Sequence, residues 1–167
     1  DADTELALEA VLWGAFGTTG QRCTATSRLI LHKDIYDDFI KRLTEKVNKL
    51  KLGYGNEPES QVGPCVSESQ RQSVHDYVKI GLEEDKANLI CGGEFATDEE
   101  LSEGWFYKPT IFADVTPGMR IEQEEIFGPV LSVIKCNDLD DAIKILNGTK
   151  YGLSSSIFTK NVNDAFK

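Results

Sequence analysis

The sequence predicts an α/β domain built around a layered sheet. Short apolar runs of β-type residues recur along the chain, and segments with helical spacing of apolar residues separate them. Strands that alternate with helices in this way are typical of α/β architecture. No repeat, low-complexity stretch or shift in composition divides the 167 residues. One domain with one sizeable core is therefore expected.

The first third of the chain is expected to run helix, strand, helix. Residues 4–16 have helical spacing and are apolar around most of the circumference, which predicts a well-buried helix. Residues 28–32 form an apolar run, which indicates a strand buried on both faces. Asp34 is expected to cap the next helix. Residues 53–64 are polar and contain two prolines, so they predict a surface loop.

The middle of the chain continues this alternation. Ser67 with Gln70 three residues later is a capping-box arrangement, which predicts the start of a third helix. Residues 87–91 predict a strand, and the Gly-Gly pair at 92–93 predicts a plain turn because it lacks the GxGxxG spacing of a phosphate loop. Residues 106–115 predict strand material, which a proline restricts to an edge or an irregular stretch.

The last part is expected to contain a strand over 130–136, a helix that begins near 138, a strand over 155–159 and a helix from 161. The buried core is expected to come from the apolar runs. Its predicted members are Leu29, Ile30, Leu31, Leu89, Ile90, Val133, Ile134, Ile157 and Phe158.

Composition excludes several classes of protein. A formal net charge of −10 argues against a nucleic-acid groove or an anionic membrane surface. No apolar run approaches the roughly 20 residues that span a bilayer. The cysteines are scattered, with no CxxC pair and only two histidines, which argues against a disulfide framework and against a metal site. They are Cys23, Cys65, Cys91 and Cys136. Free thiols favour a cytoplasmic protein.

Cys23 is the candidate nucleophile. It follows the turn at Gly20 and lies between two apolar elements, so its backbone would be held while its side chain reaches a cleft. The neighbouring Arg22 supplies positive charge, which favours the thiolate form. Packing in the core is the alternative role for any one cysteine.

Three stretches together resemble the aldehyde dehydrogenase superfamily. They are GQRCTATSR at 20–28, which is similar to the active-site segment, EEIFGPV at 124–130, which is similar to the cofactor-facing motif, and YGLSS at 151–155. The resemblance implies that residues 1–167 form most of the catalytic domain, incomplete, with the dinucleotide-binding domain absent. It implies a three-layer α/β unit with a twisted, largely parallel sheet and helices on both faces.

The resemblance also implies the chemistry. Cys23 would attack an aldehyde to form a thiohemiacetal, hydride would pass to the nicotinamide of NAD or NADP, and water or coenzyme A would release the product from a thioester. Glu125 would bind the hydroxyls of the nicotinamide ribose, and Phe127 would pack beside the nicotinamide. Leu153 would lie near the nicotinamide or the substrate, with simple packing as the alternative. The general base and the second oxyanion donor would lie outside this chain, which alone would be inactive.

The substrate and the partners are less constrained. The active-site stretch most resembles members that act on semialdehydes, such as the 2-oxoglutarate semialdehyde type, and the parent protein would be a homodimer or homotetramer. Arg22 and Arg28 could attract a distal carboxylate, although an ion pair within the fold is the favoured role for Arg28. A thiol hydrolase or acyltransferase would need a histidine beside Cys23, and His32 and His75 lack the signature. A silent assembly domain is the other alternative.

Overall fold

A computed structural model describes all 167 residues of the chain apart from the side chain of residue 99. Its strands are β1 (Arg28–His32), β2 (Asn88–Cys91), β3 (Thr110–Val115) and β4 (Val130–Cys136). Its α-helices are α1 (Thr4–Phe16), α2 (Tyr36–Val47), α3 (Glu68–Glu83), α4 (Arg120–Gln123), α5 (Leu139–Leu146) and α6 (Val162–Ala165). Two short 3₁₀ helices are η1 (Gly17–Gly20) and η2 (Glu99–Glu103).

The sheet is largely parallel, as expected. Within the part of the chain that the structure describes, four strands are ordered β1-β4-β3-β2. The central strand β4 runs parallel to both β1 and β3, and only β2 is antiparallel to its neighbour β3. The register pairs Ile30 with Ile134 and Phe112 with Ser132. The long crossovers between parallel strands contain helices, because a short turn cannot return the chain in the same direction.

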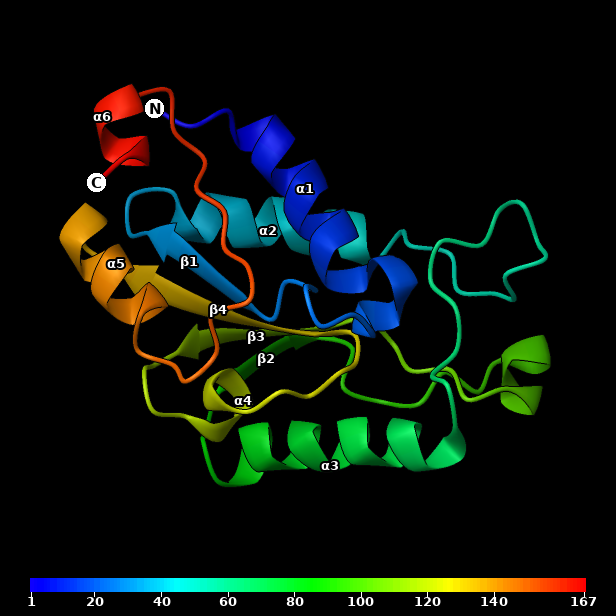
Figure 1. The fold of residues 1–167 in the computed structure, drawn as a ribbon. Helices are drawn as coiled ribbons and strands as arrows, with labels where there is room; N and C mark the ends of the chain where they lie inside the picture. The colour runs from blue at the N-terminus through cyan, green and yellow to red at the C-terminus, as the bar shows by residue number, and fades with distance from the viewer.

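Helices cover both faces of the sheet, which confirms the expected α/β architecture. In Figure 1, α1 and α2 lie on one face, while α3 and α4 lie on the other. Alternate residues of β3 supply the two cores, since Ile111 packs with the α1–α2 cluster and Phe112 packs with the α3–α4 cluster. Both of these side chains are fully buried.

Three helices begin at the polar residues that the sequence offers. The side chains of Asp3, Ser67 and Asp138 each accept a hydrogen bond from the backbone N–H three residues later. The expected cap of α2 is wrong. The helix begins at Tyr36 with Ile35 in the capping position and no side-chain cap, because the Asp34 carboxylate instead lies 3.6 Å from His32 Nδ1.

The first helix and the first strand are less buried than expected. Trp13 of α1 is 64% exposed, because α1 is apolar around most of its circumference but buries residues along one side only. In β1 only Leu31 is fully buried. This strand lies at the edge of the sheet and pairs with β4 alone, so its other residues are half-buried.

The expected strand over 155–159 is also wrong. This segment has no regular structure, and Ile157 is 50% exposed. A strand needs a hydrogen-bonding partner, and here the side chain of Thr159 bonds to the Asp1 carboxylate while no described strand pairs with the segment. Phe158 is half-buried against the α1–α2 core.

The other predicted core residues fall into two groups. Leu31, Val133 and Ile134 are fully buried, as expected. The four residues from the two edge strands are half-buried, because an edge strand has a neighbour on one side only. They are Leu29, Ile30, Leu89 and Ile90.

Two expectations for the segment between β2 and β4 need correction. Strand β3 begins at Thr110, directly after Pro109, and it lies inside the sheet instead of at an edge, while the expected irregularity is present as a register shift between Phe112 and Val115. Pro109 precedes the ladder, so its missing N–H removes no hydrogen bond from the strand. The short helix α4 was not expected, and Asp85 begins it by accepting hydrogen bonds from the N–H groups of Arg120 and Ile121.

Candidate active site

Cys23 lies in the loop between α1 and β1, and a strained turn sets the course of this loop. Thr18, Thr19 and Gly20 all have positive φ, at 56°, 59° and 65°. This left-handed conformation is unfavourable for a β-branched residue, so surrounding contacts must hold it. One such contact is the hydrogen bond that the Thr19 hydroxyl donates to the Gly63 carbonyl at 2.8 Å.

The side chain of Gln21 fixes the loop to the segment that leads into α3. Its Nε2 donates to the Pro64 carbonyl at 3.2 Å, and its Oε1 accepts from the Val66 N–H at 2.9 Å. A backbone hydrogen bond from Ala25 N to Arg22 O then closes a turn around Cys23. Cys23 is exposed, and its backbone N–H makes no hydrogen bond to any described residue. Both groups are therefore free to meet a ligand.

The loop of Cys23 touches the EEIFGPV segment at a pair of glycines. A Cβ added to Gly20 would lie 2.1 Å from the carbonyl oxygen of Gly128, far inside van der Waals contact. A Cβ on Gly128 would in turn lie 2.3 Å from Cγ2 of Val74 in α3. Glycine is required where backbones approach this closely. The structure thus brings together two of the motifs that the sequence separates by about a hundred residues.

Gln70 holds the EEIFGPV segment from the other side. Its Nε2 donates to the carbonyls of Ile126 and Phe127, at 3.2 Å and 3.0 Å. Phe127 has a left-handed backbone with φ of 56°, and the residue is 39% exposed. The sequence predicts Gln70 as a capping-box residue, and its backbone N–H does bond to Ser67. Its side chain serves the site instead, and nothing in the local sequence indicated that.

Two adjacent glutamates in this segment have different environments. Arg120 lies 2.8 Å from the Glu124 carboxylate and, with a hydrogen bond from the Tyr77 hydroxyl, lowers the pKa of Glu124 to about 2. Glu125 is exposed and has no hydrogen-bond or ion-pair partner among the described residues. Glu124 is therefore part of the fold, while Glu125 is available to a ligand.

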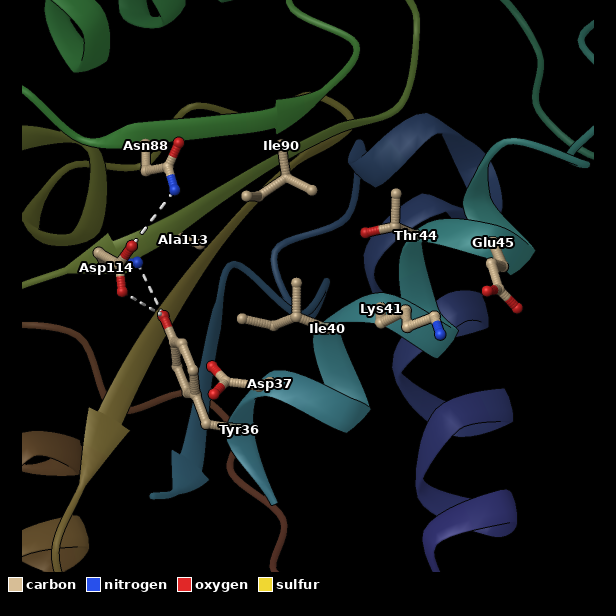
Figure 2. Close-up of a pocket in the computed structure, with 10 residues that line it drawn as sticks. All are labelled: Tyr36, Asp37, Ile40, Lys41, Thr44, Glu45, Asn88, Ile90, Ala113 and Asp114. Atoms are coloured by element: carbon tan, nitrogen blue, oxygen red, sulfur yellow. Dashed lines mark hydrogen bonds between the residues drawn. The ribbon is translucent and has the colours of Figure 1, made fainter. Parts of the chain in front are cut away.

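Two surface hollows lie away from these residues. One of about 380 Å³ lies between α2 and the β2–β3 edge, where the Tyr36 hydroxyl accepts a hydrogen bond from Asp114 N at 2.7 Å (Figure 2). A second, of about 370 Å³, lies between the end of α2 and Pro109. Cys23 and Glu125 line neither hollow. Hydride transfer from Cys23 to a nicotinamide held at Glu125 would need both side chains to open onto a common cleft, and that cleft stays a prediction.

Comparison with known proteins decides the family. The sequence model of the aldehyde dehydrogenase family matches residues 1–167. The chain belongs to the aldehyde dehydrogenase family. This agrees with the three stretches on which the sequence-based resemblance depended.

Several curated and solved aldehyde dehydrogenases are similar to the chain. The alpha-ketoglutarate semialdehyde dehydrogenase of Haloferax volcanii is 45% identical, over 95% of this chain and 32% of its own length. The betaine aldehyde dehydrogenase of Mesorhizobium japonicum is 40% identical, over 100% of this chain and 34% of its own length. The solved Staphylococcus aureus betaine aldehyde dehydrogenase in complex with NAD+ has a TM-score of 0.97 at 35% identity. The match covers 99% of this chain and 33% of that protein. The chain thus spans about a third of the relatives it matches.

In this aldehyde dehydrogenase chain, Cys23 differs from the other three thiols. Cys65 and Cys136 are buried and Cys91 is half-buried, and burial raises the pKa of each. For Cys65 and Cys91 the pKa reaches about 11. The sequence favours Cys65 as the main competitor of Cys23 because it lies in a loop region, but the structure places its side chain in the core.

We expect limited alkylation with iodoacetamide at neutral pH to label Cys23 first. The reactive form is the thiolate, and a thiol with a pKa near 11 is ionised in only about one molecule in 10,000 at pH 7. Peptide mapping after partial labelling measures the order in which the thiols react. We expect at least about tenfold preference for Cys23 over Cys65. Earlier labelling of Cys65 in the folded protein would show that Cys23 is not an accessible nucleophile.

The two histidines have partners of their own. His75 Nδ1 lies 3.0 Å from the Tyr107 hydroxyl, and burial lowers the pKa of His75. His32 lies beside Asp34 at the end of β1. Cys23 makes no hydrogen bond to either histidine within the described part of the chain. The thiol-hydrolase alternative thus lacks the base that it requires from this chain.

One further expectation is confirmed by an ion pair, while the expected place of Leu153 near the nicotinamide or the substrate stays a prediction. Arg28 forms the structural ion pair expected of it, with Glu122. Leu153 of the YGLSS stretch is exposed and lies in a segment without regular structure. No helix among the described residues is long and apolar enough to cross a membrane.

Proposed function

We propose that the chain is the nucleophile-bearing part of an NAD(P)-dependent aldehyde dehydrogenase, which oxidises an aldehyde to a carboxylic acid through a thioester on Cys23. The supporting observation is the Gly20–Gly128 contact, which joins the loop of Cys23 to the segment that carries Glu125 and Phe127. An exposed thiol and an unpaired carboxylate are thereby held by one backbone junction. The general base for hydrolysis belongs to a part of the enzyme outside these residues.

Cys23 supplies two groups to the proposed reaction. Its thiolate adds to the aldehyde carbon, and the carbonyl oxygen becomes an alkoxide that needs a hydrogen-bond donor. The unpaired backbone N–H of Cys23 fits that donor, since it makes no hydrogen bond to the described chain. The strained turn and the Gln21 contacts hold this N–H in place, so no reorganisation is needed when charge develops.

The EEIFGPV segment fits the nicotinamide half of the cofactor. The free carboxylate of Glu125 can accept hydrogen bonds from both ribose hydroxyls, and the exposed ring of Phe127 offers an apolar surface beside them. When bound, NAD or NADP supplies the hydride acceptor. Gln70 holds the backbone of this segment through the carbonyls of Ile126 and Phe127.

Replacing Glu125 by glutamine in the full-length enzyme is expected to raise the KM for NAD about tenfold and to slow turnover. The amide accepts less strongly than a carboxylate, and a loss of about 1.4 kcal/mol corresponds to a factor of ten. Initial rates of NADH formation at varied NAD measure this. Glu59→Gln, at an exposed loop residue, is the matched control and should leave KM unchanged. An unchanged KM in Glu125→Gln would remove Glu125 from the cofactor site.

For the substrate, we propose a semialdehyde with a distal carboxylate, of the 2-oxoglutarate semialdehyde kind. Relatives named for that substrate are 45% and 42% identical to this chain. Arg22 is half-buried beside Cys23, and its Nε has no hydrogen-bond partner among the described residues, so its charge is available. Arg28 is engaged in its ion pair and is not proposed for this role.

The comparison that tests the substrate class uses 2-oxoglutarate semialdehyde against betaine aldehyde, which carries the opposite charge. We expect kcat/KM to favour the semialdehyde by at least about tenfold, since a charge contact at a partly buried site contributes roughly 1–2 kcal/mol. Arg22→Gln should reduce this preference. A preference for betaine aldehyde, the substrate named for other relatives, would overturn the proposal.

We further propose that this chain alone does not turn over, because the base and the second oxyanion donor are not among its residues. The full enzyme is proposed to be a cytoplasmic homodimer or homotetramer that binds neither nucleic acid nor membrane.

A further inference from the structure

A buried ion pair lies between the segments that carry the site. Arg28 Nε and Glu122 Oε2 are 2.9 Å apart, and their side chains are 11% and 0% exposed. The N–H of Nε is not directed at the oxygen, and neither atom has another partner among the described residues. The contact is therefore a charge pair without a well-formed hydrogen bond at these two atoms.

The remaining polar atoms of both side chains also have hydrogen-bond partners, which include the Gln123 side chain beside Glu122. The two terminal nitrogens of Arg28 donate to the carbonyls of Ile145 and Leu146, at 2.6 Å and 3.2 Å, where α5 ends. The other oxygen of Glu122 accepts from the Gly118 N–H at 2.7 Å. A cation at the last carbonyls of a helix is also favoured by the helix dipole. One pair thus joins β1, α4 and the end of α5.

These three elements lie next to the three motifs in the sequence. Arg28 is the first residue of β1 and closes the GQRCTATSR stretch. Glu122 lies in α4, directly before the EEIFGPV segment. The carbonyls that Arg28 binds lie just before the YGLSS stretch, and Gln123 next to Glu122 also donates to the Gly148 carbonyl at 2.8 Å. The ion pair and its hydrogen bonds therefore connect residues that lie at or next to all three motifs.

We propose that Arg28 and Glu122 form a positioning pair, which holds the Glu125 segment at a fixed place relative to the Cys23 loop. This inference rests on the proposed function. A buried charge is tolerated only in contact with its partner, so the pair allows little displacement of α4 against β1. The Gly20–Gly128 contact lies at the other end of the EEIFGPV segment, and the segment is therefore held on both sides of Glu125 and Phe127.

The test uses the full-length enzyme and a double-mutant cycle of Arg28→Gln, Glu122→Gln and the variant with both changes. The readout is the dissociation constant for NAD, followed by quenching of intrinsic fluorescence without any substrate. We expect each single variant to bind NAD about tenfold more weakly, and the double variant to bind it no more weakly than the singles, because residues in contact act as one unit. Glu94→Gln, which breaks the exposed pair with Lys108, is the matched control and should not change NAD binding.

A purely structural role is separated by thermal unfolding in the same variants. A lower midpoint with an NAD dissociation constant within twofold of the wild type would overturn the proposal, and so would additive losses in the double variant. A different measurement tests the proposed function itself: full aldehyde oxidation by the Cys23→Ala variant would contradict it. Because NAD binding needs no thiol chemistry, the two failures are distinguishable.

Discussion

Replacing Cys23 by alanine in the full-length enzyme is expected to lower the turnover of aldehyde by at least about 1,000-fold. The thiolate forms the covalent bond on which every later step depends, and loss of a nucleophile removes the pathway rather than weakening one contact. Production of NADH, followed by its absorbance, measures the loss. NAD binding should be retained, because the side chains proposed to contact NAD belong to the EEIFGPV segment.

Cys91→Ala is the matched control for this change. Cys91 is half-buried in β2, its pKa is raised by burial, and it lies outside the three motifs. Turnover in this variant should stay within about twofold of the wild type. If Cys23→Ala kept turnover within tenfold of the wild type, Cys23 would not be the nucleophile, and the silent-domain alternative would gain support.

Replacing Gly20 by alanine is expected to destabilise the chain by about 3 kcal/mol and to impair the enzyme as strongly as the change at Cys23 impairs it. Alanine at a φ of 65° is unfavourable by about 1–2 kcal/mol, and overpacking against the backbone of Gly128 adds about 1–3 kcal/mol. The neighbour that must move is backbone, which cannot rotate away as a side chain would. The loop of Cys23 and the Glu125 segment would therefore separate.

Circular dichroism of the 167-residue chain measures the loss of stability in Gly20→Ala. We expect the midpoint of thermal unfolding to fall by roughly 6–12 °C. Gly55→Ala is the matched control, since a Cβ at Gly55 would meet no atom within 4 Å. Its midpoint should not fall. Equal midpoints for the two variants would mean that the close contact between Gly20 and Gly128 does not exist in solution.

The sequence predicts those elements whose signals are local. Strand β4 extends over the expected residues 130–136, and α1 over the expected 4–16, because apolar spacing and a nearby cap determine them. The caps at Ser67 and Asp138 also depend on the next three residues only. The layered α/β arrangement follows once helices and strands alternate in this way.

The errors arise where a distant partner decides the outcome. The run over 155–159 has the composition of a strand, but it lacks a neighbour with which to pair among the described strands. Trp13 has the spacing of a core residue, yet it is 64% exposed. A sequence pattern reports what a segment favours, and tertiary contacts decide whether that preference is met.

The same distinction between local signals and distant contacts applies to the candidate site. Cys23, Glu125 and Phe127 are predicted by the resemblance of their motifs to a family. The residues that hold them are not, because Gln70 acts through carbonyls far away in the sequence and Glu122 meets Arg28 only after folding. The difference between Glu124 and Glu125 is also invisible in the sequence, since Arg120 and Tyr77 select one of two identical side chains.

Trapping the covalent intermediate tests the central claim most directly. The full-length enzyme is mixed with NAD and one equivalent of semialdehyde, quenched in acid and digested, and its peptides are weighed by mass spectrometry. We predict an acyl group on the peptide that contains Cys23, formed with one equivalent of NADH and absent when NAD is omitted. An acyl group on a different residue, or NADH formed without any adduct at Cys23, would contradict the account.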